Sequence, residues 1–110
     1  MLLPTDIWVG ALIRRAELGG AFATVVRKGD PRAGAVLVKT FNRLDGNTVV
    51  YVEAFSGDGE RVWMEPNASH VEGDLDRYVE RAIKVDPDLW VVEIEDGEGR
   101  HFLSEPVANP

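Results

Sequence analysis

The two histidines, His70 and His101, are the residues of this 110-residue chain best suited to bind a metal ion or to move a proton. His101 follows Glu93 and Glu95, and these three form the only local group with metal-ligand chemistry. A structural zinc site needs three or four ligands that converge on one point. The hairpin expected here places only Glu95 opposite His101, so we predict a cross-strand ion pair and no metal site. His70 lies in a loop of Pro, Asn and Ser and is expected to face solvent.

The sequence contains no clear motif for catalysis by a serine or by paired carboxylates. Ser56, Ser69 and Ser104 all lie in turns or loops, and none is spaced from a histidine as a catalytic triad requires. Glu93 and Glu95 are the candidates for general acid–base work near the C-terminal strand. Acidic clusters are more often solvated surface, so we assign no catalytic residue and expect a protein that is not an enzyme. A carboxylate-dependent enzyme near Glu93 and Glu95 stays open as a third hypothesis.

A glycine-bearing basic loop is the most suggestive motif. Residues 27–34 place three cations between two predicted strands, and backbone amides beside Lys or Arg can hold phosphate or carboxylate. The loop is not a P-loop, because it lacks the Gly-x-x-x-x-Gly-Lys-Ser/Thr pattern and no helix follows it. If its cations meet those of the first helix, they form a site for a small anion or a nucleotide. The residues of this candidate site are Arg14, Arg15, Arg27, Lys28 and Arg32.

Charge and composition limit the classes of function. Residues 56–110 hold five Lys or Arg and fourteen Asp or Glu, a balance of −9, whereas residues 1–55 hold seven and five, a balance of +2. The acidic half argues against a broad nucleic-acid surface. The absence of cysteine excludes disulfides and favours a reducing compartment. No signal-peptide pattern, no run of roughly 20 apolar residues and no cofactor motif is present. We therefore expect a cytoplasmic protein outside the membrane, with no cofactor.

Helical spacing is clearest in two segments. The first begins at Thr5, which we expect to cap the helix, and it ends at Gly19 and Gly20. Its apolar face consists of Val9, Leu12, Ile13 and Ala16. The second spans about Gly73 to Val85 and ends before Pro87, because proline disfavours helix in the residue before it. Its apolar positions are Leu75, Tyr78, Val79, Ala82 and Ile83.

Strand composition marks five segments, residues 21–28, 35–41, 48–56, 61–65 and 89–95. Short turns join the first four, so we expect an antiparallel meander. A three-residue turn at 57–59 would pair Ala54 with Val62, with Gly59 in the left-handed conformation. The last segment is expected to form a hairpin with residues 100–103, in which Ile94 faces Phe102.

Several of these strands are apolar on both faces, among them residues 35–38, 49–52 and 89–92. Both faces of the sheet must then be covered, either by one helix on each face or by a homodimer. We predict an α+β fold in which a mostly antiparallel sheet of five to six strands carries two helices, one per face, in the order α-β-β-β-β-α-β-β. Residues 1–110 form a single domain with a loosely held tail at 104–110. Large aromatic residues favour burial, so Trp8, Trp63 and Trp90 are expected in the core.

The chain also resembles a known family. The residues that carry the resemblance are 3–16 (LPTDIWVGALIRRA), 20–30, 34–39, 61–63, 86–96 (DPDLWVVEIED) and 99–102. Together they resemble the small bacterial family Domain of Unknown Function 1491 over nearly the whole chain. The resemblance implies a compact bacterial α+β domain, and it implies no activity, ligand or catalytic residue.

The function therefore rests on hypotheses. The leading one is a non-enzymatic binding or interaction domain whose partner is another protein or a second copy of this chain. Exposed sheet edges and strands that are apolar on both faces favour it. The second is the small-anion or nucleotide-binding domain that uses the five basic residues of the first half.

Overall fold

Five strands form one mixed sheet with the order β1-β5-β2-β3-β4. The computed structural model describes residues 3–55, 57–66 and 69–108. Its strands are β1 (Phe22–Arg27), β2 (Val36–Asn42), β3 (Thr48–Phe55), β4 (Arg61–Met64) and β5 (Trp90–Asp96). Its helices are α1 (Thr5–Leu18) and α2 (Glu72–Val85). These elements coincide closely with the segments predicted from the sequence.

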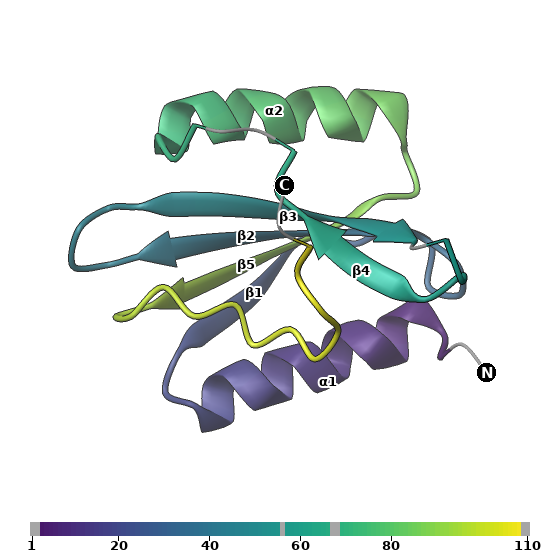
Figure 1. The fold of residues 1–110 in the computed structure, drawn as a ribbon, viewed down its shortest axis with the longest axis horizontal. Helices are drawn as coiled ribbons and strands as arrows, with labels where there is room; N and C mark the ends of the chain where they lie inside the picture. Colours follow the sequence, from purple (N-terminus) through teal and green to yellow (C-terminus); the bar gives the residue numbers. More distant parts are fainter. Residues whose placement is uncertain (1–2, 56, 67–68, 109–110) are drawn as a thin grey trace.

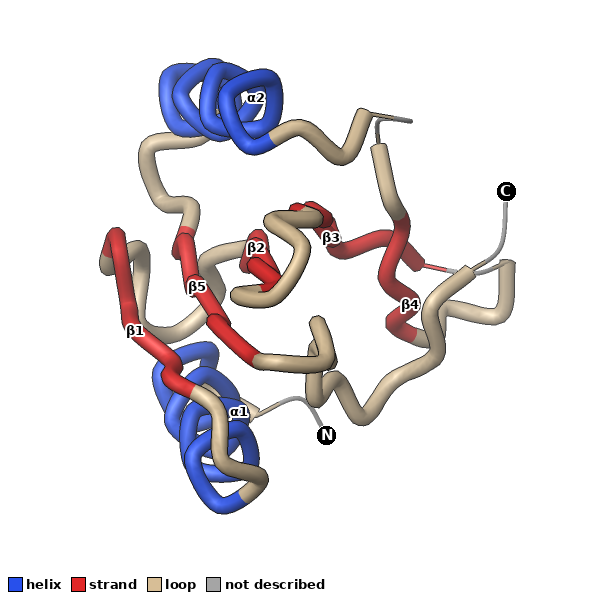
Figure 2. The backbone as a smooth tube through the Cα atoms, turned by 90° about the vertical axis from the view of Figure 1, so that its left-hand side faces the viewer, coloured by secondary structure: helices blue, strands red, loops and turns tan. Residues whose placement is uncertain are grey.

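One helix covers each face of the sheet, as predicted. Figures 1 and 2 show α1 against one face and α2 against the other. The three tryptophans are buried in the core on the α1 side, which confirms their predicted role. The core on the α2 side contains Leu37, Val50, Leu75, Leu89 and Val91. Two helices of the same chain therefore account for strands that are apolar on both faces.

Strand β5 makes the sheet mixed: three of the four strand pairings are antiparallel, as predicted, but the expected meander of the first four strands is not formed. Strand β5 is parallel to β2 and antiparallel to β1, so β1 and β2 are not neighbours. The central place suits β5, because most of its residues are buried, whereas β1 alternates exposed and half-buried residues. The connection between β1 and β2 spans residues 28–35, which is long enough to cross the width of one intervening strand, about 10 Å from β1 to β2.

The predicted hairpin at the C-terminal end is wrong. Residues 100–103 form no strand, because β1 and β2 already occupy both edges of β5. Phe102 instead adopts a positive φ of 60°, outside the range of an extended strand. Glu95 pairs with Phe22 on β1 and with Phe41 on β2, so the predicted Glu95–His101 ion pair is not formed.

The turn between β3 and β4 confirms the predicted register. Ala54 pairs with Val62 and Val52 with Met64. Gly59 has a φ of 84°, in the left-handed region that glycine adopts without strain.

Thr5 does not cap α1, contrary to the prediction. Its hydroxyl donates a hydrogen bond to the carbonyl of Gly34 at 2.8 Å, and its amide donates to the carbonyl of Arg32 at 3.2 Å. The amide of Asp6 donates to Pro31 in the same way. Carbonyls of the loop before β2 therefore satisfy the first amides of the helix, and they fix its start beside that loop.

Residues 104–108 lie along β4, although a loosely held tail was expected from residue 104 onward. The amide of Trp63 donates to the carbonyl of Pro106 at 2.9 Å, and that of Ala108 donates to Trp63 at 2.7 Å. These bonds pair the segment with the outer edge of β4 and cover that edge. Residues 109 and 110 lie outside the described part of the chain.

A buried lysine connects α2 to the sheet. Lys39 Nζ lies 3.1 Å from Glu72 and 2.8 Å from Asp76 on α2, and 3.6 Å from Glu93 on β5. Burial acts to lower the pKa of Lys39, but the three carboxylates outweigh burial and raise the pKa. Neither α1 nor α2, the helices in the described residues, is long and apolar enough to cross a membrane.

Asp96 organises the turn that follows β5. Its side chain is only 3% exposed and accepts hydrogen bonds from the amides of Glu98 and Arg100 and from the Arg100 guanidinium. The guanidinium contact is the main reason why the pKa of Asp96 lies well below its ordinary value. The carboxylate therefore stabilises the fold only while it is ionised.

Asp96→Asn tests this role. We expect the variant to lose about 1–3 kcal/mol of unfolding free energy at neutral pH, because charge-assisted hydrogen bonds become neutral ones. The wild type should lose the same contribution as the pH falls below 3.8, the ordinary pKa of an Asp, while the variant should not. Urea denaturation at several pH values measures both effects. Glu98→Gln, an exposed carboxylate in the same turn, is the matched control, and equal losses in both variants would contradict the assignment.

Candidate functional site

Two adjoining cavities lie at the end of the sheet where β2 begins and β3 ends. We call them the helix cavity, between α2 and the sheet, and the loop cavity, beside residues 32–35. Ala35 and Glu53 line both of them. The hydrogen-bonded ladder of β2 and β3 stops at Leu37 and Val52, so the two strands separate here. This separation leaves Glu53 in the wall between the cavities.

The helix cavity has a volume of about 480 Å³ and a mainly apolar lining. The sheet contributes Ala35, Leu37 and Val52, and Leu89 closes one side. The last turns of α2 contribute Tyr78, Arg81, Ala82 and Val85, and Asp86 follows them. Cavities of roughly 300–1,000 Å³ with few polar groups are typical of small-molecule sites. The charged groups here are Glu53, Arg81 and Asp86, which together carry one net negative charge when ionised.

The loop cavity is smaller, about 240 Å³, and lies near the start of α1. Leu3, Thr5 and the backbone of residues 32–35 form one side, and Phe55 and Arg61 form the other. Its charged groups are Arg32, Arg61 and Glu53, which together carry one net positive charge. The two cavities therefore have opposite charge bias on either side of Glu53.

Glu53 is the buried ionisable group of this site, with a side chain that is 9% exposed. One of its oxygens accepts the amide hydrogen of Val36 at 2.8 Å, and the other lies 3.4 Å from Arg61 Nε. Burial raises the pKa of Glu53 above its ordinary value, although Arg61 and the Val36 amide act in the opposite direction. A carboxyl with a raised pKa in a cavity wall is a recognised mark of a functional site.

A second carboxylate, the half-buried Glu105, also lies near Arg61. It accepts hydrogen bonds from the indole nitrogens of Trp8 and Trp63, both at 3.1 Å. The two rings stack with their centroids 5.4 Å apart, and the Arg61 guanidinium lies 5.4 Å from the centre of the Trp8 ring. Burial acts to raise the pKa of Glu105, but the indole hydrogen bonds outweigh burial and lower the pKa. This network holds Arg61 in place beside Glu53.

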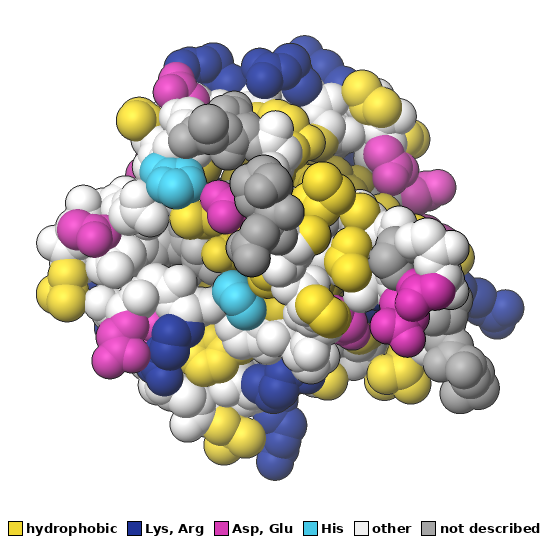
Figure 3. Space-filling view, in the orientation of Figure 1, with side chains coloured by type: hydrophobic (Ala, Val, Ile, Leu, Met, Phe, Trp, Pro, Cys, Tyr) yellow, Lys and Arg dark blue, Asp and Glu magenta, His cyan; other side chains and the backbone are white. Residues whose placement is uncertain are grey.

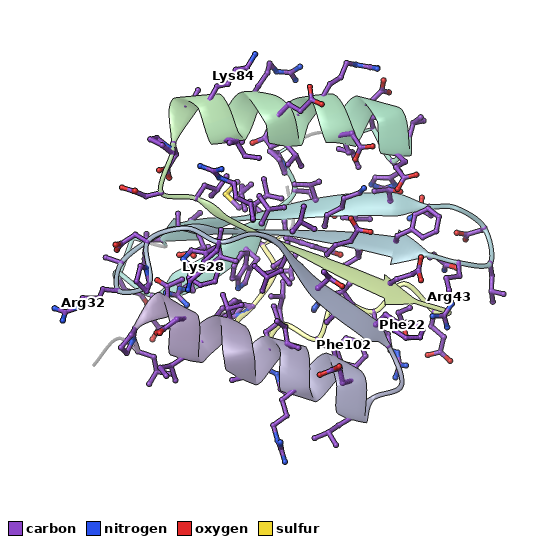
Figure 4. The ribbon with its side chains drawn as sticks, turned by 180° about the vertical axis from the view of Figure 1, so that it is seen from behind. Phe22, Lys28, Arg32, Arg43, Lys84 and Phe102 are labelled. Atoms are coloured by element: carbon purple, nitrogen blue, oxygen red, sulfur yellow. The ribbon has the colours of Figure 1, made fainter. Side chains whose placement is uncertain are left out.

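The five basic residues predicted as an anion site do not surround one cavity. Arg15 Nε donates to the carbonyl of Phe102, and Arg27 donates to the carbonyl of Pro87. Arg14 and Lys28 are exposed and line neither cavity. Arg32 alone of the five lines the loop cavity, and Figure 4 shows its side chain extending outward from the end of the molecule. Whether any of the five binds an anion stays a prediction.

The histidines and the acidic pair of β5 also lie outside the two cavities. Figure 3 shows the two histidines apart on one face of the molecule. His70 pairs with Glu65 at 3.1 Å, and His101 packs edge-on against Tyr51. Glu93 takes part in the ion pairs of Lys39. Within residues 3–55, 57–66 and 69–108, no three carboxylates or imidazoles are grouped as a metal site would require.

Sequence reasoning missed Glu53 and Arg61 as site residues. One signal was available, because Glu53 directly follows the apolar run Val49–Val52 within a predicted strand. A charged residue at such a position is either exposed or part of a buried polar site. The second signal, the proximity of Arg61, depends on the β3–β4 register, which pairs Glu53 with Trp63.

Comparison with known proteins identifies relatives of the chain. The sequence model of a family described as "Protein of unknown function (DUF1491)" matches residues 3–104. A crystal structure of a DUF1491 family protein from Caulobacter crescentus CB15 is 68% identical, with a TM-score of 0.96 over 97% of this chain and 100% of the other. An NMR structure of a DUF1491 family protein from the same organism is also 68% identical, with a TM-score of 0.93 and 99% coverage of both chains.

A more distant structure has the same fold. Protein Atu0922 from A. tumefaciens is 33% identical, with a TM-score of 0.81 over 99% of this chain and 98% of the other. No curated protein matches the chain.

The raised pKa of Glu53 predicts a specific pH dependence. From 4.5, the ordinary pKa of a Glu, up to the raised value, the folded state binds more protons than the unfolded state, so stability falls as the pH rises. Glu53→Gln keeps an acceptor for the Val36 amide but cannot ionise, so it should lose this decline. Urea denaturation across this pH range measures the difference from wild type. Glu80→Gln, on the exposed side of α2, is the control, and a decline that persists in Glu53→Gln would contradict the prediction.

Proposed function

The chain belongs to the DUF1491 family, whose members are described as proteins of unknown function, and we propose that it is a non-enzymatic protein that binds a small amphipathic ligand in the helix cavity. The observation that carries this proposal is the apolar cavity of about 480 Å³ with the Glu53 carboxyl in its wall. The volume and lining suit an alkyl or aryl group, whose burial provides most of the binding free energy.

The polar groups of the helix cavity favour a hydrogen-bond donor on that ligand. Glu53 lines this cavity and accepts one directed hydrogen bond, from the Val36 amide, so its carboxylate retains acceptor capacity. Asp86 adds a second carboxylate to the lining, against the single cation of Arg81. An amine with an apolar body therefore matches the cavity better than a carboxylate does. Nothing in this arrangement requires a chemical reaction on the ligand, so binding alone is the proposed activity.

Amide chemical-shift titrations with hexylamine, hexanol and hexanoate test the ligand class. We expect saturable shifts at Leu37, Val52 and Ala82 that are largest for hexylamine and smallest for hexanoate. Glu53→Gln should weaken hexylamine binding by about tenfold, because one charge-assisted contact is lost. Ala82→Phe should abolish binding, because its ring fills the cavity.

The matched control for Ala82→Phe is Ala11→Phe, at an exposed position on α1 at the other face of the sheet. Equal shifts with all three probes, or hexylamine binding that survives Ala82→Phe, would contradict the proposal. Ala82→Leu, with a smaller added volume, guards against a loss that results only from misfolding.

A second candidate function, weak self-association, is favoured by the open edge of β1. The tail covers the β4 edge, whereas no described strand or bridge lies outside β1. Phe22 and Val26 on this strand are 68% and 57% exposed. Antiparallel pairing about Thr24 would place Phe22 opposite Val26 of a second copy. The irregularity between Val25 and Arg27 limits the paired length, so we expect a weak dimer.

Sedimentation velocity over a concentration series tests this association. We expect a dimer to appear only toward about 1 mM protein, as a dissociation constant near that value implies. Phe22→Lys should remove it, because the two copies would then place cations in the interface. Leu18→Lys, at an equally exposed apolar position on α1, should leave it unchanged. A monomer at every concentration would exclude this surface as a site of self-association.

A further inference from the structure

We propose that the loop cavity is a second binding site, which takes a small carboxylate on the guanidinium of Arg61. This site is separate from the helix cavity and would bind a ligand of opposite charge. The loop cavity holds about 240 Å³, enough for a short alkyl or aryl acid but not for a nucleotide. Its lining residues include two cations, Arg32 and Arg61, and one carboxylate, that of Glu53.

Arg61 has donor capacity that the described residues do not use. Its Nε atom is buried and has no hydrogen-bond partner, although Glu53 lies 3.4 Å away as an ion-pair partner. The nearest oxygen of Glu105 is 4.0 Å from a terminal nitrogen of Arg61, and the Glu105 oxygens already accept the two indole hydrogen bonds. A guanidinium carries five N–H donors, so a planar carboxylate could accept two of them at once.

The surroundings of Arg61 keep it ready for such a ligand. The side chain is 19% exposed, and its guanidinium lies against the Trp8 ring, which limits its freedom to move. A donor group that is already ordered loses less entropy when a ligand arrives. Arg61 is therefore a fixed anchor in the cavity wall, unlike a flexible surface cation.

The cavity favours a carboxylate with a short apolar body over inorganic phosphate. Leu3 and Phe55 supply apolar surface beside Arg61, and the lining contains one cation that is held in place by packing. Arg32 extends outward at the rim, where it attracts anions without enclosing them (Figure 4). Phosphate sites usually offer several donors at close range, whereas a carboxylate needs one bidentate arginine.

In this proposal, the Glu53 carboxylate competes with the ligand's carboxylate for the Arg61 guanidinium. A bound carboxylate would lie close to the Glu53 carboxylate, and the two negative charges would repel each other. Removal of the Glu53 charge should therefore strengthen carboxylate binding in the loop cavity while it weakens amine binding in the helix cavity. A residue with only a structural role would not change the two affinities in opposite directions.

Butyrate is the probe for the experiment, with amide chemical shifts as the readout. We expect saturable shifts around Ala35 and Phe55 with millimolar affinity in the wild type, and no binding by Arg61→Met. Glu53→Gln should bind butyrate about three- to tenfold more tightly, the change expected when one nearby like charge is removed. Arg77→Met, which removes an arginine paired with Asp74 on the exposed side of α2, should leave butyrate binding unchanged.

Three results would overturn the proposal. They are an absence of saturation in both wild type and Glu53→Gln, undiminished binding by Arg61→Met, and equal binding of inorganic phosphate. Hexylamine titration of Arg61→Met separates this proposal from the proposed function. Retained hexylamine binding shows that the variant is folded and that the helix cavity works, so that a failure with butyrate concerns the loop cavity alone.

Discussion

Strand β5 is hydrogen bonded along both edges and buried on both faces, and the positions of the other elements follow from this. Because β1 and β2 both pair with β5, the connection between them must cross the end of that strand. The crossing is tight, since the amide of Asp30 donates to the carbonyl of Asp88 and the Trp90 indole donates to Asp30. A Cβ atom at Gly29 or Gly34 would collide with the Asp88 carbonyl, so glycine is required at both positions. The start of α1 then docks on the same loop.

The same crossing creates the cavities. The loop brings Ala35 to the end of the sheet, and β2 begins at Val36 without a backbone partner on β3 for its first amide. The Glu53 side chain accepts that amide hydrogen, as a backbone carbonyl would do in a longer ladder. The Glu53 side chain thus takes the place of a backbone acceptor at the end of the ladder. Open volume remains on either side of this side chain. The chemistry of the molecule is concentrated at the end of the sheet where regular pairing stops.

Local patterns in the sequence predicted the elements well but not their assembly. The spacing of Leu75, Val79 and Ala82 predicted α2, and the glycine turn before β4 predicted the register of β3 and β4, because both depend on neighbours in the chain. The place of β5 depends on contacts between residues far apart in sequence, and a hairpin with residues 100–103 satisfied every local rule equally well. The basic loop was identified from its composition, yet Arg27 is engaged by Pro87, 60 residues away. By contrast, the predicted register of β3 and β4 does bring Arg61 near Glu53, but it could not show that both residues line a cavity.

The two carboxylates near Arg61, Glu53 and Glu105, have different surroundings. Glu105 accepts two indole hydrogen bonds, its pKa is lowered, and it locks the tail onto the stacked rings of Trp8 and Trp63. Glu53 has one directed hydrogen bond and a raised pKa, and it faces open volume on two sides. A neutral glutamine could accept the Val36 amide hydrogen, but it would leave the Arg61 guanidinium without its nearest counter-charge. The charge at position 53 therefore balances Arg61, and the open volume on either side of it is what distinguishes Glu53 from Glu105.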